Sequence, residues 1–429
     1  MIETTAAAPA SPGLQRRMVV TLVGSQMLGG VGVASGITVG SLLAADLAGN
    51  ETWAGLANTF QVIGSALIAI PVARLMAARG RRPGLLAGYG VAFVGAVLVL
   101  VAMVVRNFPL LLVGALLFGG ATTANNQARY AAVDLSEERH RGRDLSIVVW
   151  STTLGAVLGP NLTGPGGNVA DLLGLPRLVG GFVFSLVGFA LAAALLATRL
   201  RPDPLLVARQ LAYAEGDSDT PEHRSHGSVT RGLRVIGRYP MAAMGLIAAA
   251  VAHAVMVSIM VMTPLHMQHG HAELRVIGFV ISMHVLGMFA FSPLVGVAVD
   301  RLGGLTVALV GAGILIVAGL MAAASQAGWS MLLMIALFLL GLGWSCAYVS
   351  GSTMLAAALP VEERAGGQGA ADLMMGLVAG GGGALAGVVV DHFGYHELGL
   401  GAAVLAVVIV VAAAVIRPGR RAPASALVD

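Results

Sequence analysis

Methionine and histidine side chains gather in one apolar stretch of the chain, HAVMVSIMVMTPLHMQHGHAELRVIGFVISMHVLGM (residues 253–288). It holds six of the 19 methionines and five of the 10 histidines. Thioether sulfur and imidazole nitrogen suit copper, above all Cu(I), and are poor ligands for magnesium or calcium. The residue types therefore indicate a site for a soft metal ion. Whether such a site can form depends on the elements that carry these residues.

The rest of the chain indicates a protein that crosses a lipid bilayer many times. Of its 429 residues, 57% are hydrophobic and only 11% are charged, whereas soluble domains have about 25% charged residues. A helix needs about 20 apolar residues to span ~30 Å of hydrocarbon. Twelve runs meet this length, at residues 18–43, 53–76, 83–105, 109–131, 144–168, 177–199, 240–265, 276–299, 304–325, 329–352, 369–391 and 397–416. We expect an all-α integral membrane fold with twelve transmembrane helices.

Arginine placement predicts the orientation of these helices. The 25 basic residues are all arginines, and 21 of them fall in cytoplasmic segments if the chain starts inside the cell. The outer loops hold three, Arg106, Arg177 and Arg275, and Arg129 lies within the fourth span. This asymmetry obeys the positive-inside rule, so we expect a multi-pass protein of the bacterial cytoplasmic membrane with both termini inside. The arginines follow topology, so the net charge of +4 is no sign of nucleic-acid binding.

Two loops indicate that the chain is a duplicated six-helix unit. ARLMAARGRR (73–82) matches GVAVDRLGG (296–304) at an offset of 223, and LSEER (135–139) matches LPVEER (359–364) at an offset of 225. Agreement between separate loops is typical of internal repeats in transporters. We expect the following division: a tail at 1–17, a first bundle at 18–200, a cytoplasmic linker at 201–239, a second bundle at 240–416 and a tail at 417–429.

The loop after the eighth span carries a family resemblance. Gly296, Asp300, Arg301 and Gly303 resemble the signature gating loop of the major facilitator superfamily, and the resemblance covers nearly the whole chain. It implies two pseudo-symmetric bundles that rock about a central site in a monomeric secondary transporter without a resident cofactor. No His-Glu-x-x-His, Gly-x-Ser-x-Gly or phosphate-loop motif occurs in the sequence, so we do not expect an enzyme.

The loop after the second span is a partial copy of this motif. It keeps Gly80, Arg81 and Arg82 but has Ala77 and Ala78 where the family has Asp and Arg. The resemblance therefore implies the full gating motif on the second half alone. A third copy, GVVVDHFG (387–394), closes the eleventh span.

Helical spacing places the methionines and histidines on shared faces. In the seventh span, His253, Met256 and Met260 lie three and four residues apart, and in the eighth His284 and Met288 lie four apart. At ~1.5 Å per residue, Met256 and His284 lie roughly 12–13 Å deep, and His253 and Met288 lie roughly 18 Å deep. The sequence thus predicts matched pairs on two antiparallel helices. Histidine inside a membrane span usually marks function, although methionine also fills irregular helix interfaces.

These paired motifs resemble those of the CcoA-like copper importers, which are bacterial major facilitator proteins. The resemblance implies copper as the transported ion, with Met256, Met260, His284 and Met288 as its ligands. We expect secondary metal contacts from a further group in and beyond the seventh span, namely His253, His266, Met267, His269 and His271. The single cysteine, Cys346, excludes an internal disulfide, and we interpret it as a packing residue.

Two other transport functions stay open. Riboflavin importers are related to the copper importers, and an importer of riboflavin or another small organic solute would depend on polar residues in the spans, such as Asn58, Gln61, Asn125 and Trp344. A proton-coupled exporter of drugs or metabolites would need a coupling carboxylate, for which Asp46 and Asp372 are the candidates. It would also fit a glycine-rich fifth span, but we interpret Gly155 and Gly159 as sites of close helix packing.

The fourth span ends in a polar run, ANNQARYAAVD (124–134). A buried arginine is costly in lipid, so we expect Arg129 to face a cavity or a protein partner. We favour a protein partner, and expect Arg129 to form a salt bridge with Asp134 or Asp144 at the inner interface.

Overall fold

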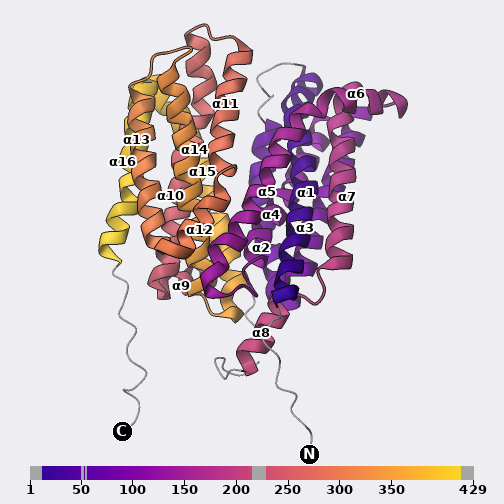
Figure 1. Ribbon diagram of the computed structural model, residues 1–429. Helices are drawn as coiled ribbons and strands as arrows, with labels where there is room; N and C mark the ends of the chain where they lie inside the picture. Colours follow the sequence, from indigo (N-terminus) through magenta and orange to yellow (C-terminus); the bar gives the residue numbers. More distant parts are fainter. Residues whose placement is uncertain (1–11, 50–52, 54–55, 215–228, 417–429) are drawn as a thin grey trace, which may run out of the picture.

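The computed structural model describes residues 12–49, 53, 56–214 and 229–416, which are almost entirely helical (Figure 1). The helices of the first half are α1 (Pro12–Ala48), α2 (Leu56–Arg79), α3 (Arg81–Val104), α4 (Phe108–Ala131), η2 (Glu138–His140), α5 (Arg141–Asn161), α6 (Thr163–Leu172), η3 (Arg177–Val179) and α7 (Gly180–Arg199). Two short helices follow, α8 (Pro204–Ala214) and α9 (Val229–Arg238). The second half comprises α10 (Pro240–His269), α11 (Leu274–Phe289), α12 (Ser292–Leu302), α13 (Gly304–Ala323), α14 (Met331–Ala358), α15 (Val361–His392) and α16 (Tyr395–Val415).

The helix boundaries follow local sequence signals. Asn107 caps α4 by accepting from the Leu110 amide at 2.9 Å, and Ser330 caps α14 in the same way. The paired loops of the two halves turn at glycines with positive φ, +95° at Gly80 and +86° at Gly303. Side chains rarely adopt this conformation, so the shared glycine marks the duplicated turn.

The predicted transmembrane helices are present, with two departures from straight spans. In the part of the chain that the structure describes, eleven helices are long and apolar enough to cross a membrane, and a twelfth arises if one bent pair counts as a single span. That pair is the fifth span, in which Glu138–Gly159 and Gly164–Leu172 meet at 67°. Six of the nine residues in the segment GPNLTGPGG (159–167) are glycine or proline, and its two prolines lack the amide donor of a helical hydrogen bond, so α6 projects sideways (Figure 1). The eighth span is broken into α11 and α12 just before Pro293.

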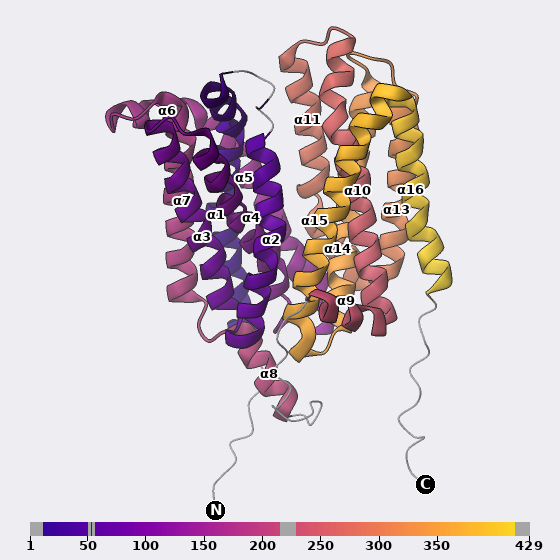
Figure 2. The same ribbon diagram turned by 180° about the vertical axis from the view of Figure 1, so that it is seen from behind.

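The helices form two bundles, seen from both sides in Figures 1 and 2. One buried apolar cluster is built mainly from α1 to α7 and another mainly from α10 to α16. The start of α1 and the end of α16 lie at the same end of the molecule as α8 and α9, together with the turns from α2 to α3 and from α12 to α13 (Figure 1). We call this the arginine-rich end. The segment between the bundles, predicted only as a polar linker, contains the helices α8 and α9.

Glycines allow α1 and α5 to pack closely in the first half. A Cβ added at Gly155 would lie 2.5 Å from the Gly30 backbone, and one at Gly159 would lie 2.3 Å from the Ala34 side chain. Any larger residue at these positions would push the helices apart. The interpretation of these glycines as sites of close helix packing is confirmed.

Candidate functional site

A buried salt bridge joins the two halves. Arg129 of α4 donates to Asp372 of α15 at 2.6 Å, and both side chains are at most 4% exposed. The amide of Gln127 donates to the other oxygen of the same carboxylate at 2.7 Å, and Arg129 also reaches Ser352 of α14 at 3.2 Å. The expected partners of Arg129, Asp134 or Asp144, are therefore wrong. The expectation of a protein partner holds, but that partner lies 243 residues away in sequence.

A second buried guanidinium, that of Arg81, also links the two halves. Arg81 donates to Asp134 through two bonds of 2.7 and 3.1 Å, and it crosses to Gln368 of α15 at 2.6 Å. It takes this position because Gly80 turns the chain and the carboxylate of Asp203 accepts from the amides of Arg81 and Arg82 at 3.0 and 2.7 Å. The first-half loop thus reaches the other half through a buried side chain.

The second-half loop makes a different link to the first half. The carboxylate of Asp300 accepts from the backbone amides of Gly142 and Arg143 at 2.7 and 2.9 Å, so it caps the start of α5. Gly296 lets α12 approach, because a Cβ there would lie 2.0 Å from the Ser146 hydroxyl oxygen. Arg301 is exposed at this end.

These three links close the arginine-rich end. The participating residues lie on α3, α4, α5, α12, α14 and α15, towards the arginine-rich end, or on the loop that follows α4. Six hydrogen bonds of this group join side chains or backbone of one bundle to the other. We call it the inner gate, because the arginine distribution predicts that this end faces the cytoplasm. It would have to open for a solute to leave towards this side.

Aromatic rings extend the inner gate towards the middle of the second half. The Arg129 guanidinium lies over the rings of Tyr130 and Tyr348, at 4.3 and 4.4 Å from their centroids. Tyr348 stacks on Trp344 at 4.4 Å, and the indole of Trp344 donates to Nδ1 of His253 at 2.9 Å. Phe289, at the break between α11 and α12, packs edge-on against Trp344. We call this group the aromatic–arginine cluster; its members are Arg129, Tyr130, His253, Phe289, Trp344 and Tyr348.

The predicted copper ligands are distributed around α14. This helix is the principal neighbour of both α10, which carries Met256 and Met260, and α11, which carries His284 and Met288. Met256 is buried in the second-half core, and the other two methionines are partly exposed. Within the described residues, no hydrogen bond joins the α10 residues to His284. The expected pairing of residues at matched depth stays a prediction.

The two histidines within the spans, His253 and His284, differ in which ring nitrogen could act as a metal ligand. Nδ1 of His284 donates to the Leu337 carbonyl at 2.9 Å, and its buried Nε2 has no partner among the described residues. A carbonyl that fixes one ring nitrogen while the other is bare is the usual arrangement of a metal-binding histidine. His253 is the reverse case, because its Nδ1 accepts from Trp344 and its Nε2 must carry the proton. Nε2 of His253 is therefore a donor rather than a ligand.

The remaining candidates lie outside the inner gate. Met267 is fully buried, His266 stacks on Tyr395 at 3.9 Å, and His269 and His271 are exposed. In the described part of the chain, no three His, Cys, Asp or Glu residues gather as a metal group. At the end of the molecule opposite the arginine-rich end, Asp46 forms a salt bridge with Arg106 in which both side chains are at least 40% exposed. Asp46 is thus a surface residue in this structure.

Of the polar residues predicted for an organic solute, Trp344 belongs to the aromatic–arginine cluster, and the others lie in the first bundle. Gln61 is buried on α2, and Asn125 accepts from the Tyr89 hydroxyl at 2.6 Å. Cys346 is buried where α14 packs on Gly311 of α13, in agreement with a packing role. Tyr130, Tyr348 and Gln368 were missed by sequence reasoning. The polar run around Arg129 was a signal for the first of them, and nothing local marked the other two.

Known proteins resemble the chain along its whole length. The sequence profile of the Major Facilitator Superfamily matches residues 21–272 and 245–428. The chain is 37% identical over 401 residues to the uncharacterized MFS-type transporter YddS of Bacillus subtilis, covering 92% of this chain and 90% of the relative. It is 26% identical to the riboflavin transporter RfnT of Brucella anthropi, covering 85% and 87%. Among solved structures, the proton:xylose symporter XylE superimposes with a TM-score of 0.74 at 14% identity, covering 93% of this chain and 95% of that one.

Proposed function

Because this chain belongs to the major facilitator superfamily and is a secondary transporter, we propose that its substrate is a small, planar organic solute of the riboflavin type. The observation that carries the proposal is the aromatic–arginine cluster. Its rings and guanidinium come from both halves, with Arg129 and Tyr130 on α4 and Trp344 and Tyr348 on α14. A solute bound there would contact both moving parts.

The chemistry of the cluster suits a flat, polar ring system. Indole and phenol rings stack on aromatic solutes, and an arginine adds cation–π attraction. The free Nε2–H of His253 can donate to a carbonyl of the solute. The riboflavin transporter relative supports this class of substrate.

The Arg129–Asp372 pair would couple transport to protons. A proton on Asp372 removes the charge that holds Arg129, and in a low-dielectric site this weakens the link between the halves considerably. In this scheme, solute binding and protonation of Asp372 both weaken the contacts of the inner gate. The two bundles then separate at that end, which gives alternating access. We propose import, driven by the inward proton gradient.

Transport by purified protein in liposomes tests the proposal. With an acidic exterior, we expect uptake of radiolabelled riboflavin, and we expect Trp344→Ala to raise KM roughly tenfold or more, since one stacked ring contributes about 1–3 kcal/mol. Trp329→Ala is the matched control, because Trp329 is 50% exposed and lies outside the cluster. Uptake that is absent, or equal in wild type and Trp344→Ala, contradicts the proposal. Efflux from loaded vesicles without uptake supports the proton-coupled exporter.

Copper import is a second candidate, favoured by one observation. The bare, buried Nε2 of His284, with Met288 one turn further along α11, is a place where Cu(I) could bind. None of the relatives described above is named as a copper transporter. Cellular copper measured by mass spectrometry in a deletion strain decides it. Wild type should restore accumulation, whereas His284→Ala and Met256→Ala/Met260→Ala should not.

A further inference from the structure

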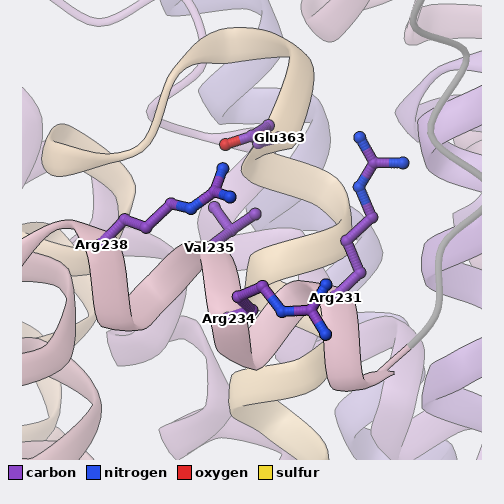
Figure 3. Close-up of a pocket in the computed structure, with 5 residues that line it drawn as sticks. All are labelled: Arg231, Arg234, Val235, Arg238 and Glu363. Atoms are coloured by element: carbon purple, nitrogen blue, oxygen red, sulfur yellow. The ribbon is translucent and has the colours of Figure 1, made fainter.

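Three arginines of α9 line a cavity at the arginine-rich end (Figure 3). Arg231, Arg234 and Arg238 are three and four residues apart, so they share one face of the helix. The cavity has a volume of about 230 Å³ and is completed by Val235 and by Glu363 of α15. Figure 3 shows the Glu363 side chain reaching from the first turn of α15 towards Arg238.

The opposite face of α9 is fixed to the second half. Gly232 and Ile236 are buried there, and a Cβ added at Gly232 would lie 2.7 Å from the Cβ of Ala370 on α15. The arginine face is therefore held in place by packing. Because α10 starts at Pro240, two residues after α9 ends, the cavity lies where the chain enters the membrane.

The charges around the cavity are unbalanced. Three guanidinium groups face one carboxylate, and among the described residues no ion pair within 4.0 Å joins Arg231, Arg234 or Arg238 to an acidic group. The N-terminus of α15, which has no side-chain cap, adds partial positive charge on the same side.

We propose that this cavity binds a phosphate group. Guanidinium groups recognise phosphate oxygens through forked, charge-assisted hydrogen bonds, and the cavity is large enough for one such group. The phosphate can belong to an anionic lipid of the adjacent leaflet or to a soluble ion, and the recognition chemistry is the same in both cases. A phosphate bound between α9 and α15 would hold the helix that carries Gln368 and Asp372 of the inner gate.

Thermal unfolding of the full-length protein in detergent tests the site. The additions are phosphatidylglycerol, phosphatidylcholine at the same mole fraction, and sodium phosphate against sodium chloride at equal ionic strength. We expect phosphatidylglycerol to raise Tm by several degrees and phosphatidylcholine to have little effect. In Arg234→Gln and Arg238→Gln the apparent affinity should fall about tenfold, the loss expected for a charge-assisted hydrogen bond. The control Arg199→Gln removes an exposed arginine at the same end, from α7, and should respond like wild type.

The outcomes separate the sources of the phosphate. A shift with sodium phosphate alone that is lost in the cavity variants supports the site and assigns it to a soluble ion. Arg234→Lys, which keeps the charge but not the forked geometry, serves if a glutamine variant does not purify as a monodisperse protein, and it should show partial loss. The proposal is overturned if wild type responds to neither anion, or if the cavity variants respond as Arg199→Gln does.

Discussion

Both copies of the duplicated loop contact the other half at the arginine-rich end, but they use different residues. The second-half copy uses a carboxylate and the first-half copy uses an arginine. In the second half, Asp300 caps α5 of the other bundle through two backbone amides. In the first half, Ala77 occupies the equivalent position and α15 has no side-chain cap. Instead, Arg81 is buried, paired with Asp134 and bonded across the seam to Gln368. Gly304 occupies the position equivalent to Arg81 in the second half.

The incomplete motif of the first half therefore still forms a contact between the two bundles. The first-half loop lost the carboxylate that would cap a helix and kept a guanidinium that reaches the other bundle directly. The second-half loop reaches the other bundle through the Asp300 cap instead. The two contacts differ in burial and so in what their loss should cost, and that difference is open to test.

The largest effect should follow loss of the first-half contact. Arg81→Met leaves Asp134 buried and unpaired, which should destabilise the protein by about 3–5 kcal/mol. Replacing both partners, in Arg81→Met/Asp134→Leu, should recover most of that stability. Unfolding by SDS in mixed micelles measures both variants. If Arg81→Met costs no more than Asp300→Ala, the two loops contribute equally and the comparison fails.

The shared glycines should differ in their tolerance of a side chain. Backbone strain at positive φ costs of order 1–3 kcal/mol at either position. At Gly80 the new Cβ would also lie 2.5 Å from the Asp203 carboxylate, whereas nothing lies within 4 Å at Gly303. Gly80→Ala should therefore lower the unfolding midpoint more than Gly303→Ala does. Equal midpoints would show that Asp203 adjusts freely.

A smaller effect is expected from the second-half contact. Asp300→Ala removes a cap from α5 and should cost about 0.5–2 kcal/mol. Asp300→Asn keeps an acceptor oxygen and should lose only part of this. The same SDS unfolding series detects both. A cost above that of Arg81→Met would reverse the ranking of the loops.

The smallest effect should come from restoring the missing carboxylate. Ala77→Asp restores a carboxylate to the first-half loop at the end of α2, which packs against α15, and an acidic group near the N-terminal part of α15 should add up to about 1 kcal/mol. Slower transport should accompany it, because a tighter inner gate opens less often. Transport that is faster than wild type, measured in the same liposomes, would show that the loop does not act on the gate.

The fold was predictable because bilayer thickness sets the length of the apolar runs and membrane topology sets where the arginines lie, and both can be read from the local sequence. Apolar runs identified the spans, and the loops at 73–82 and 296–304 identified the repeat. The breaks in the fifth and eighth spans were missed, although Pro160 and Pro293 lie beside them. A run of hydrophobic residues shows that a segment is buried in lipid but not that it is straight.

The candidate site was less predictable because it depends on which helices are neighbours. Arg129 was recognised as costly in lipid, but its partner Asp372 lies on a helix of the other bundle. Spacing correctly placed His284 and Met288 on one helix but could not show that α14 is the principal neighbour of both α10 and α11. The copper site stays a prediction for this reason.

A distance measurement across the inner gate tests the central claim most directly. Ala78 and Ala357 are exposed on opposite halves at the arginine-rich end, so Ala78→Cys and Ala357→Cys in a Cys346→Ser background accept spin labels. Double electron–electron resonance without solute should give one short distance in wild type. Arg81→Met should add a large longer-distance population, and Asp300→Ala a smaller one. Distributions unchanged in both variants would contradict the account, because neither loop would then be holding the two halves together.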